Sequence, residues 1–527
     1  MMIKKISAVV LAVMISAGMV CMTTAFAADE NAVAATAQEY AADKDAGEQL
    51  VQNVLDKKDE IIKDMQSFDT DPDVSFSYSA WFQDLDLDGT PEFIMGGRVG
   101  DGSRHFYILD KDGKVNHLEG NSGVHDHIDG PEGFAYELCR NIYTGEFLYM
   151  MQGDVVRKMT FSADKGVTEE ELCKTTYDEK TNSDVYTVGG KQVNKTQYGV
   201  FLSTISSYVP VDVTTTVIYQ YEFAAAGKDE LLKAYNDYTY SVPTKETGKA
   251  DMIRNVKDAY DLLDEDLGDL SVEMSPDVEW DYEGWFEDID FDGVPEFLIG
   301  GAADYEDGTS KRVFMAIDSS EYSFITDNRV SSDHGKGAES FGYKPYKNKT
   351  TGEYALLTAD SYADKDTENY AVRRLVYAVG KYMETDLCTA QKDKTSGKTT
   401  YTVEGSEVSE EDFQKYLSSL NSTYEELSVN IESTGGKTIL TDESVLSSSY
   451  DTYKLGDVVG GASFTYEEKQ NTSNDISIPD KTAGSQASKN YNTDSSTNPS
   501  TGAAAGVTAA IIAAGAGLAI CAKRKKK

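Results

Sequence analysis

Two short acidic stretches contain the residues of this chain that are best suited to chemistry. Asp84, Asp86, Asp88, Gly89 and Glu92 follow the pattern D-x-D-x-D-G-x-x-E. Three carboxylates at alternate positions converge only where the backbone turns tightly, and glycine permits such a turn. Converged carboxylates repel one another unless a hard cation, which takes about six to eight oxygen ligands, lies between them. The spacing therefore predicts a cation-binding loop, with calcium the favoured ion.

The same pattern occurs a second time further along the chain. The segments 74–97 and 278–301 align without gaps at an offset of 204, and 13 of their 24 positions are identical. This indicates an internal duplication with two calcium sites, and the backbone carbonyls of the residues after the glycines are predicted as further ligands. The predicted ligands are Asp84, Asp86, Asp88, Thr90, Glu92, Asp288, Asp290, Asp292, Val294 and Glu296. The alternative is that the acids only decorate a solvated turn, but the recurrence of the whole set favours a metal.

Neither loop is an EF-hand. The twelfth position, where an EF-hand places its bidentate glutamate, is Met95 in one copy and Ile299 in the other. The acid comes at the ninth position and an apolar strand follows it. In this the loops resemble those of FG-GAP and VCBS-type repeats of extracellular proteins, which implies calcium binding between two strands. The resemblance covers only the loop, so no propeller fold is expected.

The elements that must position these loops also recur. Apolar residues at helical spacing predict an amphipathic helix before each loop, over 50–65 and over 252–263. Further helices are expected at 195–207 and 410–420, the latter with Ser409 as its N-cap. Turns are expected at 144–146 and 351–353, each between two short strands. A short insertion in the second copy is expected to lie in a surface loop.

These patterns predict an α+β fold built from a tandem duplication. Each unit has an N-terminal helix, a central and mainly antiparallel sheet, and late helices. The predicted units span 46–245 and 246–455. Trp81 and Trp285, next to the loops, are expected to pack in the core rather than to stack on sugars. Cys173 and Cys388 occupy matching places and are expected to be half-buried thiols, since the cysteines are too few for a disulfide framework.

The N-terminal residues indicate export. Lys4 and Lys5 precede an apolar run, and the segment 1–27 ends in Ala25-Phe26-Ala27, which is typical of a signal peptide. Residues 28–45 are Ala-rich and polar and are interpreted as a lead-in. The protein is therefore expected to be secreted.

The C-terminal residues predict a second signal. Residues 456–497 are rich in Ser, Thr, Asn and Asp, which favours a disordered, wall-spanning linker. Asn498, Pro499, Ser500, Thr501 and Gly502 precede an apolar run over 503–522 and a basic tail over 523–527. An ordinary membrane anchor has a similar run and tail.

Motif, apolar run and tail together resemble the LPxTG-like sorting signal of Gram-positive cell-wall proteins, with Asn in place of Leu. The resemblance implies that a sortase cuts between Thr501 and Gly502 and joins the protein to peptidoglycan. The transmembrane segment, predicted within 498–527, would then hold the protein in the membrane only before sorting.

Charge restricts the choice of partners. The formal net charge of the chain is −41, so nucleic acid and anionic lipid are disfavoured by electrostatic repulsion. Divalent cations and cationic partners are favoured.

Catalytic signatures are weak. Asp126-His127 and Asp333-His334 stand at matching places and would suit a metal site or an oriented base, although a loop hydrogen bond is the commoner role. HExxH and GxSxG motifs do not occur. The leading hypothesis is a non-enzymatic, wall-attached protein on the extracellular face of a Gram-positive bacterium that adheres to or captures a glycan or a protein. The alternatives are a surface hydrolase of glycans or peptides and a structural component of the wall layer.

Overall fold

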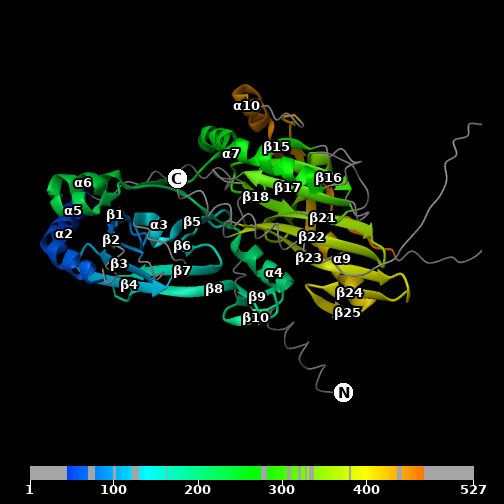
Figure 1. Cartoon of the computed structure of the whole chain (residues 1–527), viewed down its shortest axis with the longest axis horizontal. Coiled ribbons are helices and arrows are strands. Elements are labelled where there is room, and N and C mark those ends of the chain that lie inside the picture. The colour runs from blue at the N-terminus through cyan, green and yellow to red at the C-terminus, as the bar shows by residue number, and fades with distance from the viewer. Residues whose placement is uncertain are drawn as a thin grey trace, which may run out of the picture. The chain divides into compact units, whose positions relative to one another are not determined.

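The structure is a computed structural model, and it describes residues 44–68, 77–98, 103–121, 130–162, 164–273, 282–304, 310–317, 322–326, 329–330, 337–378, 381–435 and 442–467. These residues belong to one compact unit that ends at Glu467, and many of its elements are labelled in Figure 1. The fold is mixed α and β, and the strand pairs of the described residues are antiparallel. Both features confirm the coarse prediction. For description we divide the unit into a first half, 44–244, and a second half, 245–467.

The first half contains two large sheets. A five-stranded sheet has the order β13-β1-β2-β3-β4, and a seven-stranded sheet has the order β10-β9-β8-β7-β6-β5-β11. The strands are β1 (Ser79–Gln83), β2 (Glu92–Arg98), β3 (Ser103–Leu109), β4 (Val115–Asn121), β5 (Glu137–Asn141), β6 (Phe147–Met151), β7 (Val155–Ser162), β8 (Gly166–Asp178), β9 (Ser183–Val188), β10 (Lys191–Val193), β11 (Tyr208–Pro210) and β13 (Ile218–Tyr219), with β12 (Asp212–Thr214) and β14 (Thr239–Ser241) forming a separate pair. The helices are α2 (Lys44–Met65), a 3₁₀ turn η1 (Gln66–Phe68), α3 (Gly130–Phe134), α4 (Lys195–Ile205), α5 (Gln220–Ala225) and α6 (Lys228–Asp237).

The second half also contains two large sheets. One has the order β15-β16-β17-β18, with β19 on β17, and the other has the order β25-β24-β23-β22-β21-β20-β26-β27. The strands are β15 (Glu283–Glu287), β16 (Glu296–Asp304), β17 (Ser310–Ile317), β18 (Tyr322–Thr326), β19 (Arg329–Val330), β20 (Lys344–Asn348), β21 (Tyr354–Ala363), β22 (Thr367–Ala378), β23 (Lys381–Asp393), β24 (Thr399–Val403), β25 (Ser406–Val408), β26 (Tyr424–Asn430) and β27 (Lys454–Gly461). The helices are α7 (Lys245–Glu273), α8 (Ala338–Phe341), α9 (Glu410–Thr423) and α10 (Glu443–Thr452).

Both halves have the same order of layers, because each sheet must bury one face against a helix or another sheet. In the first half, α2, α5 and α6 cover the sheet of β1–β4, whose other face packs on the sheet of β5–β9, and α4 covers the far side. In the second half α7 and α10 cover the sheet of β15–β18, which packs on the larger sheet, and α9 covers the far side. The predicted helices at 50–65, 195–207 and 410–420 correspond to α2, α4 and α9, and Ser409 caps α9 as expected.

Helix α4 also contacts the second half. Tyr198 and Leu202 on α4 belong to a core that includes Val376 and Ala378 of β22. On the same helix, a Cβ at Gly199 would lie 1.9 Å from Oγ1 of Thr385 on β23. Only glycine permits this approach. We call the contact of α4 and Tyr143 with β21, β22 and β23 the junction.

Three expectations need correction. The predicted linker starts too early, because residues 456–467 belong to the compact unit: β27 pairs with β26, and Phe464 is 5% exposed. The residues expected to lie in a surface loop instead lengthen two strands, since β21 and β22 are longer than β6 and β7. Cys173 and Cys388 are fully buried free thiols rather than half-buried ones, because α4 and α9 cover them completely.

Candidate metal-binding loops

Each acidic loop connects two strands that pair at its base. Gln83 pairs with Glu92 below loop 1, residues 84–91, and Glu287 pairs with Glu296 below loop 2, residues 288–295. The tryptophan two positions before each base residue is buried, as expected. Its indole N–H donates to the base residue, at 3.0 Å from Nε1 to Oε1 of Gln83 and at 2.9 Å from Nε1 to Oε2 of Glu287. The loops are thus held to the core at a fixed angle.

The backbone of the two loops turns in the same way. Leu87 and Phe291 have φ values of 60° and 65°, and the glycines two positions later have φ values of 90° and 98°. Such left-handed residues allow the chain to fold back over the first aspartate of the loop. The Gly89 N–H donates to Oδ2 of Asp84 and the Gly293 N–H donates to Oδ2 of Asp288, both at 3.0 Å.

The structure gathers most of the predicted carboxylates. In loop 2, Asp288, Asp290, Asp292 and Glu296 each contribute an oxygen that lies within 4.8 Å of the others. In loop 1 the group comprises Asp84, Asp86 and Asp88 at the same spacing, and Glu92 is not part of it. Two acidic clusters that could hold a metal ion are therefore present, and the second is the more complete.

The glutamates and the residues after the glycines hydrogen-bond within their own loops. The Glu92 and Glu296 carboxylates accept the N–H of Leu85 at 2.7 Å and of Ile289 at 2.8 Å, which closes each loop from below. The Thr90 and Val294 N–H groups donate to the preceding aspartates, at 2.8 and 2.6 Å. A ligand role for the carbonyls of Thr90 and Val294 remains a prediction.

The pKa values show the electrostatic cost of gathering these acids. Burial, followed by the charge of Asp86, raises the pKa of Glu92 to about 9. Burial raises the pKa of Asp84 to about 6. In loop 2, burial and the neighbouring aspartates raise the pKa values of Asp288 and Glu296 well above their usual range. Without a cation, each site therefore resists full ionisation.

One atom indicates that a cation fits loop 2. Asp288 is 8% exposed, and its Oδ1 is buried without a hydrogen-bond partner. A buried carboxylate oxygen without a partner costs about 1–3 kcal/mol or more. Among the described residues, no lysine or arginine forms an ion pair with Asp288, Asp292 or Glu296. A divalent cation would give this oxygen a partner and offset two of the four carboxylate charges, since hard cations accept several carboxylate oxygens at once.

Loop 1 differs because a lysine reaches it. Lys111, in the turn after β3, places Nζ 2.5 Å from Oδ2 of Asp88. Burial alone would raise the pKa of Asp88. The hydrogen bond from Lys111 nevertheless holds this pKa below its usual range. Sequence reasoning missed this contact. When the alignment of β3 with β17 is continued along the sequence, Ser319 corresponds to Lys111. This difference between the two aligned sequences could have indicated that a lysine serves loop 1.

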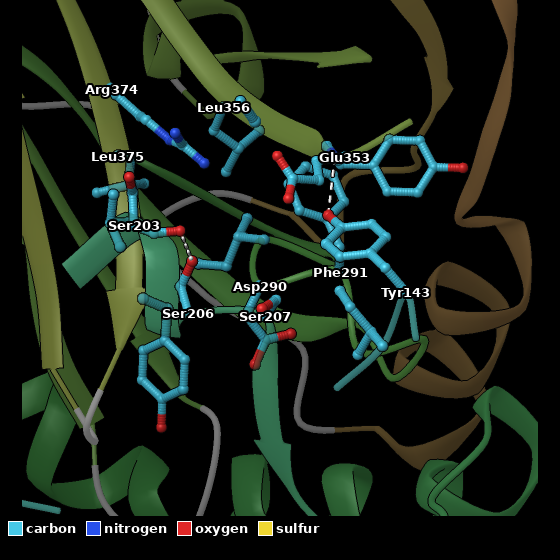
Figure 2. A pocket seen from close by; sticks show the side chains of 16 residues that line it. Tyr143, Ser203, Ser206, Ser207, Asp290, Phe291, Glu353, Leu356, Arg374 and Leu375 are labelled. Carbon is cyan, nitrogen blue, oxygen red and sulfur yellow. Dashed lines mark hydrogen bonds between the residues drawn. The ribbon is translucent and has the colours of Figure 1, made fainter. Parts of the chain in front are cut away.

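A small cavity lies beside loop 2 (Figure 2). It has a volume of about 30 Å³, and its walls include Asp290 and Phe291 from loop 2, Tyr143 and Ser203 from the first half, and Arg374 from β22. The cavity is too small for an organic substrate, because binding sites for such molecules measure hundreds of Å³. It marks the place where loop 2 meets the junction.

The other predicted sites lie outside the described residues. These are the two Asp-His pairs, Asp126-His127 and Asp333-His334, and the sorting motif over 498–502. The signal peptide and the apolar run over 503–522 also lie outside them. Among the helices that the structure describes, none has the length and apolarity needed to cross a membrane.

Comparison of the chain with protein-family models and with curated proteins gives no match.

Proposed function

We propose that this protein is displayed on the outer surface of a Gram-positive cell and that calcium stabilises it through its two acidic loops. We also propose that it captures a glycan or a protein ligand without catalysing a reaction. The observation that carries the calcium part is the loop 2 cluster, in which four carboxylates each offer an oxygen within 4.8 Å of the others. One member, Asp288, has a buried Oδ1 without a hydrogen-bond partner. The signal peptide and the sorting motif of the sequence support the address.

Calcium suits both the site and the address. Extracellular modules bind calcium with dissociation constants of about 10⁻⁴ to 10⁻³ M, because their surroundings supply the ion at such concentrations. The equal order of layers in the two halves supports an origin by duplication. We propose that each copy kept its loop as a structural site.

The calcium part is tested by thermal unfolding of the full-length chain. With calcium at about 100 times its dissociation constant, one site stabilises the folded state by about 2.7 kcal/mol, so the unfolding midpoint should rise by several degrees over that in EGTA. Magnesium should give a smaller shift, because it keeps its own water shell and requires octahedral geometry. Equal midpoints in calcium and EGTA would reject calcium as a structural ligand.

The address is tested by fractionation of the native cells. The protein should remain with the wall after boiling in detergent and should be released by a peptidoglycan hydrolase. A Thr501→Ala variant should stay in the membrane fraction, because the peptide bond that a sortase cuts follows Thr501. Release of the intact wild-type protein into the medium contradicts wall attachment.

Ligand capture is tested by a glycan array and a parallel turnover screen on wall and host polymers. We expect saturable binding without turnover. Cleavage of any polymer at a catalytic rate would favour the hydrolase instead, and silence in both assays would favour a structural component of the wall layer.

A further inference from the structure

The two loops share one backbone conformation but lie in different surroundings. Leu87 of loop 1 is 37% exposed. Phe291, at the matching position of loop 2, packs on Tyr354 at the start of β21, with ring centroids 5.2 Å apart. The same turn therefore points one side chain to solvent and the other into the protein.

Tyr354 continues the contact into the first half. Its backbone N–H donates to the Tyr143 hydroxyl at 2.7 Å, and the two rings lie 6.2 Å apart. Tyr143 follows β5, so loop 2 is joined to the first half through three aromatic side chains and one hydrogen bond. Figure 2 shows Tyr143, Phe291 and Asp290 around the same cavity.

Helix α4 borders this cavity from the other side. Ser203 of α4 and Ser206, the residue that caps its C-terminus, line it together with Asp290, a member of the loop 2 cluster. One turn before Ser203, Gly199 allows α4 to lie against Thr385 of β23. Loop 2 and α4 therefore share one cavity, so a shift of the loop would change the packing beside the helix.

Charge distinguishes the loops in the same direction. Lys111 supplies loop 1 with a positive charge from the chain itself. The loop 2 cluster has four carboxylates instead of three, and the matching position, 319, is a serine. Without a bound cation, repulsion among Asp288, Asp290 and Asp292 would spread loop 2 and move Phe291 away from Tyr354.

We infer that the cation bound by loop 2 fixes the junction between the two halves, and that loop 1 has no such part. This inference rests on the proposed calcium binding and goes beyond it, because it assigns different roles to two loops of nearly the same sequence. Loop 2 is also the tighter of the two sites, since Lys111 competes with the cation at loop 1.

Hydrogen exchange of the full-length chain, followed by mass spectrometry, tests the inference. The probe is calcium alone, added or removed with EGTA. Removal of calcium should speed the amide hydrogen exchange of α4 by about tenfold. The largest possible effect is about 100-fold when calcium is at 100 times its dissociation constant. Helix α9 is the internal control, because it has the place of α4 in the second half but lies outside the junction, and its exchange should change by less than about twofold.

Matched variants separate the loops. Asp292→Asn should reproduce the effect of EGTA on α4, whereas Asp88→Asn, at the same position of loop 1, should leave α4 exchange within about twofold of wild type. Phe291→Leu copies loop 1 and should keep calcium binding, measured by titration calorimetry, while α4 exchange loses most of its response to calcium. Lys111→Met should tighten binding at loop 1.

The outcomes are distinguishable. Equal responses of α4 and α9, or equal effects of Asp292→Asn and Asp88→Asn, would overturn the inference while leaving calcium as a structural ligand. Unchanged calcium sensitivity of α4 in Phe291→Leu would also overturn it. Calorimetry that detects no calcium binding to the wild-type chain would instead reject the calcium part of the proposed function.

Discussion

At the scale of single residues, the two loops differ at their base, where a glutamine in one and a glutamate in the other occupy the same buried position. Gln83 and Glu287 occupy matching positions, are 5% and 4% exposed, and accept the same hydrogen bond from a tryptophan indole. Only Glu287 titrates, and burial raises its pKa to about 7. The amide makes the same contact without the cost of burying a charge.

Replacing Glu287 by the residue of the other copy should stabilise the protein at alkaline pH. A raised pKa in the folded state means that stability is present below about pH 4.5 and is lost as the pH rises through about 7. Glu287→Gln removes this loss, so its free energy of unfolding at pH 8, measured in EGTA by denaturant titration, should exceed that of wild type by about 1–3 kcal/mol. The two should agree within about 0.5 kcal/mol at pH 4.

The reciprocal variant is the control. Gln83→Glu should destabilise the protein at pH 8 and have a smaller effect at pH 5. An advantage of Glu287→Gln that does not depend on pH would show that titration of Glu287 is not its cause.

At the scale of elements, α4 and α9 are equivalent helices with different neighbours. Each has an N-cap that accepts a backbone N–H, Asn194 and Ser409 respectively, and each covers the far face of a large sheet. Helix α4 is packed on both sides, because β22 and β23 of the second half lie against it. Glycine in a helix costs about 1 kcal/mol relative to alanine, and here the close approach to Thr385 requires it.

Gly199→Ala should therefore destabilise the protein despite its higher helix propensity. The added methyl group would collide with Oγ1 of Thr385, and overpacking of this kind costs about 1–3 kcal/mol. Denaturant unfolding measures the loss. A second substitution, Thr385→Ala, should restore most of it, since it removes the colliding oxygen, which is buried without a hydrogen-bond partner.

Gln414→Ala is the matched control on α9, because Gln414 has the place of Gly199 and the hydrogen bond from its side-chain amide to the Tyr466 carbonyl is long at 3.3 Å. It should change stability by less than about 1 kcal/mol. A neutral Gly199→Ala would contradict the close packing of α4 on β23.

At the scale of the whole molecule, the compact unit extends to Glu467. Phe464 packs in the core between α9 and the largest sheet, together with Tyr346 and Ala462. A linker that began at residue 456 would leave that core open. The chain after β26 thus belongs to the fold.

Phe464→Ala should cost about 3–5 kcal/mol of unfolding free energy, because a fully buried aromatic side chain is lost and a cavity is left. Val459→Ala is the control within the same segment. Val459 is 62% exposed on β27, so its loss should change stability by no more than about 0.5 kcal/mol. Equal and small effects of both substitutions would support the earlier linker boundary.

Local sequence signals predicted what depends on local chemistry. The apolar spacing of Leu50, Val54 and Ile61 identified α2, and the acidic pattern identified the loops whose carboxylates the structure brings together. The buried positions of Trp81 and Trp285 were also predicted. Each of these depends on residues close together in the chain, so periodicity and spacing were sufficient.

Contacts between distant residues were not predicted. Gly199 of α4 resembled an ordinary helix glycine, and nothing near it in the sequence pointed to Thr385. The exposed residues of β27 have the composition of a linker, because an edge strand buries little of its own surface. The strand is held to the fold by its pairing with β26, by Leu455 and by the later Ala462 and Phe464. The sorting signal and the Asp-His pairs remain predictions.

The contact between Asn421 and Phe464 has a mechanical consequence. The Asn421 side chain on α9 holds the backbone of Phe464 by both of its polar groups, with Nδ2 donating to the carbonyl at 2.8 Å and Oδ1 accepting the N–H at 2.7 Å. A pull on the chain from its C-terminal side would load this clamp before it reached β27, which lies at the edge of its sheet. If both yield, the strand can peel away while the acidic loops remain folded behind it. The last residues of the unit would then be the first part of the fold to unfold when tension is applied to the C-terminal end of the chain.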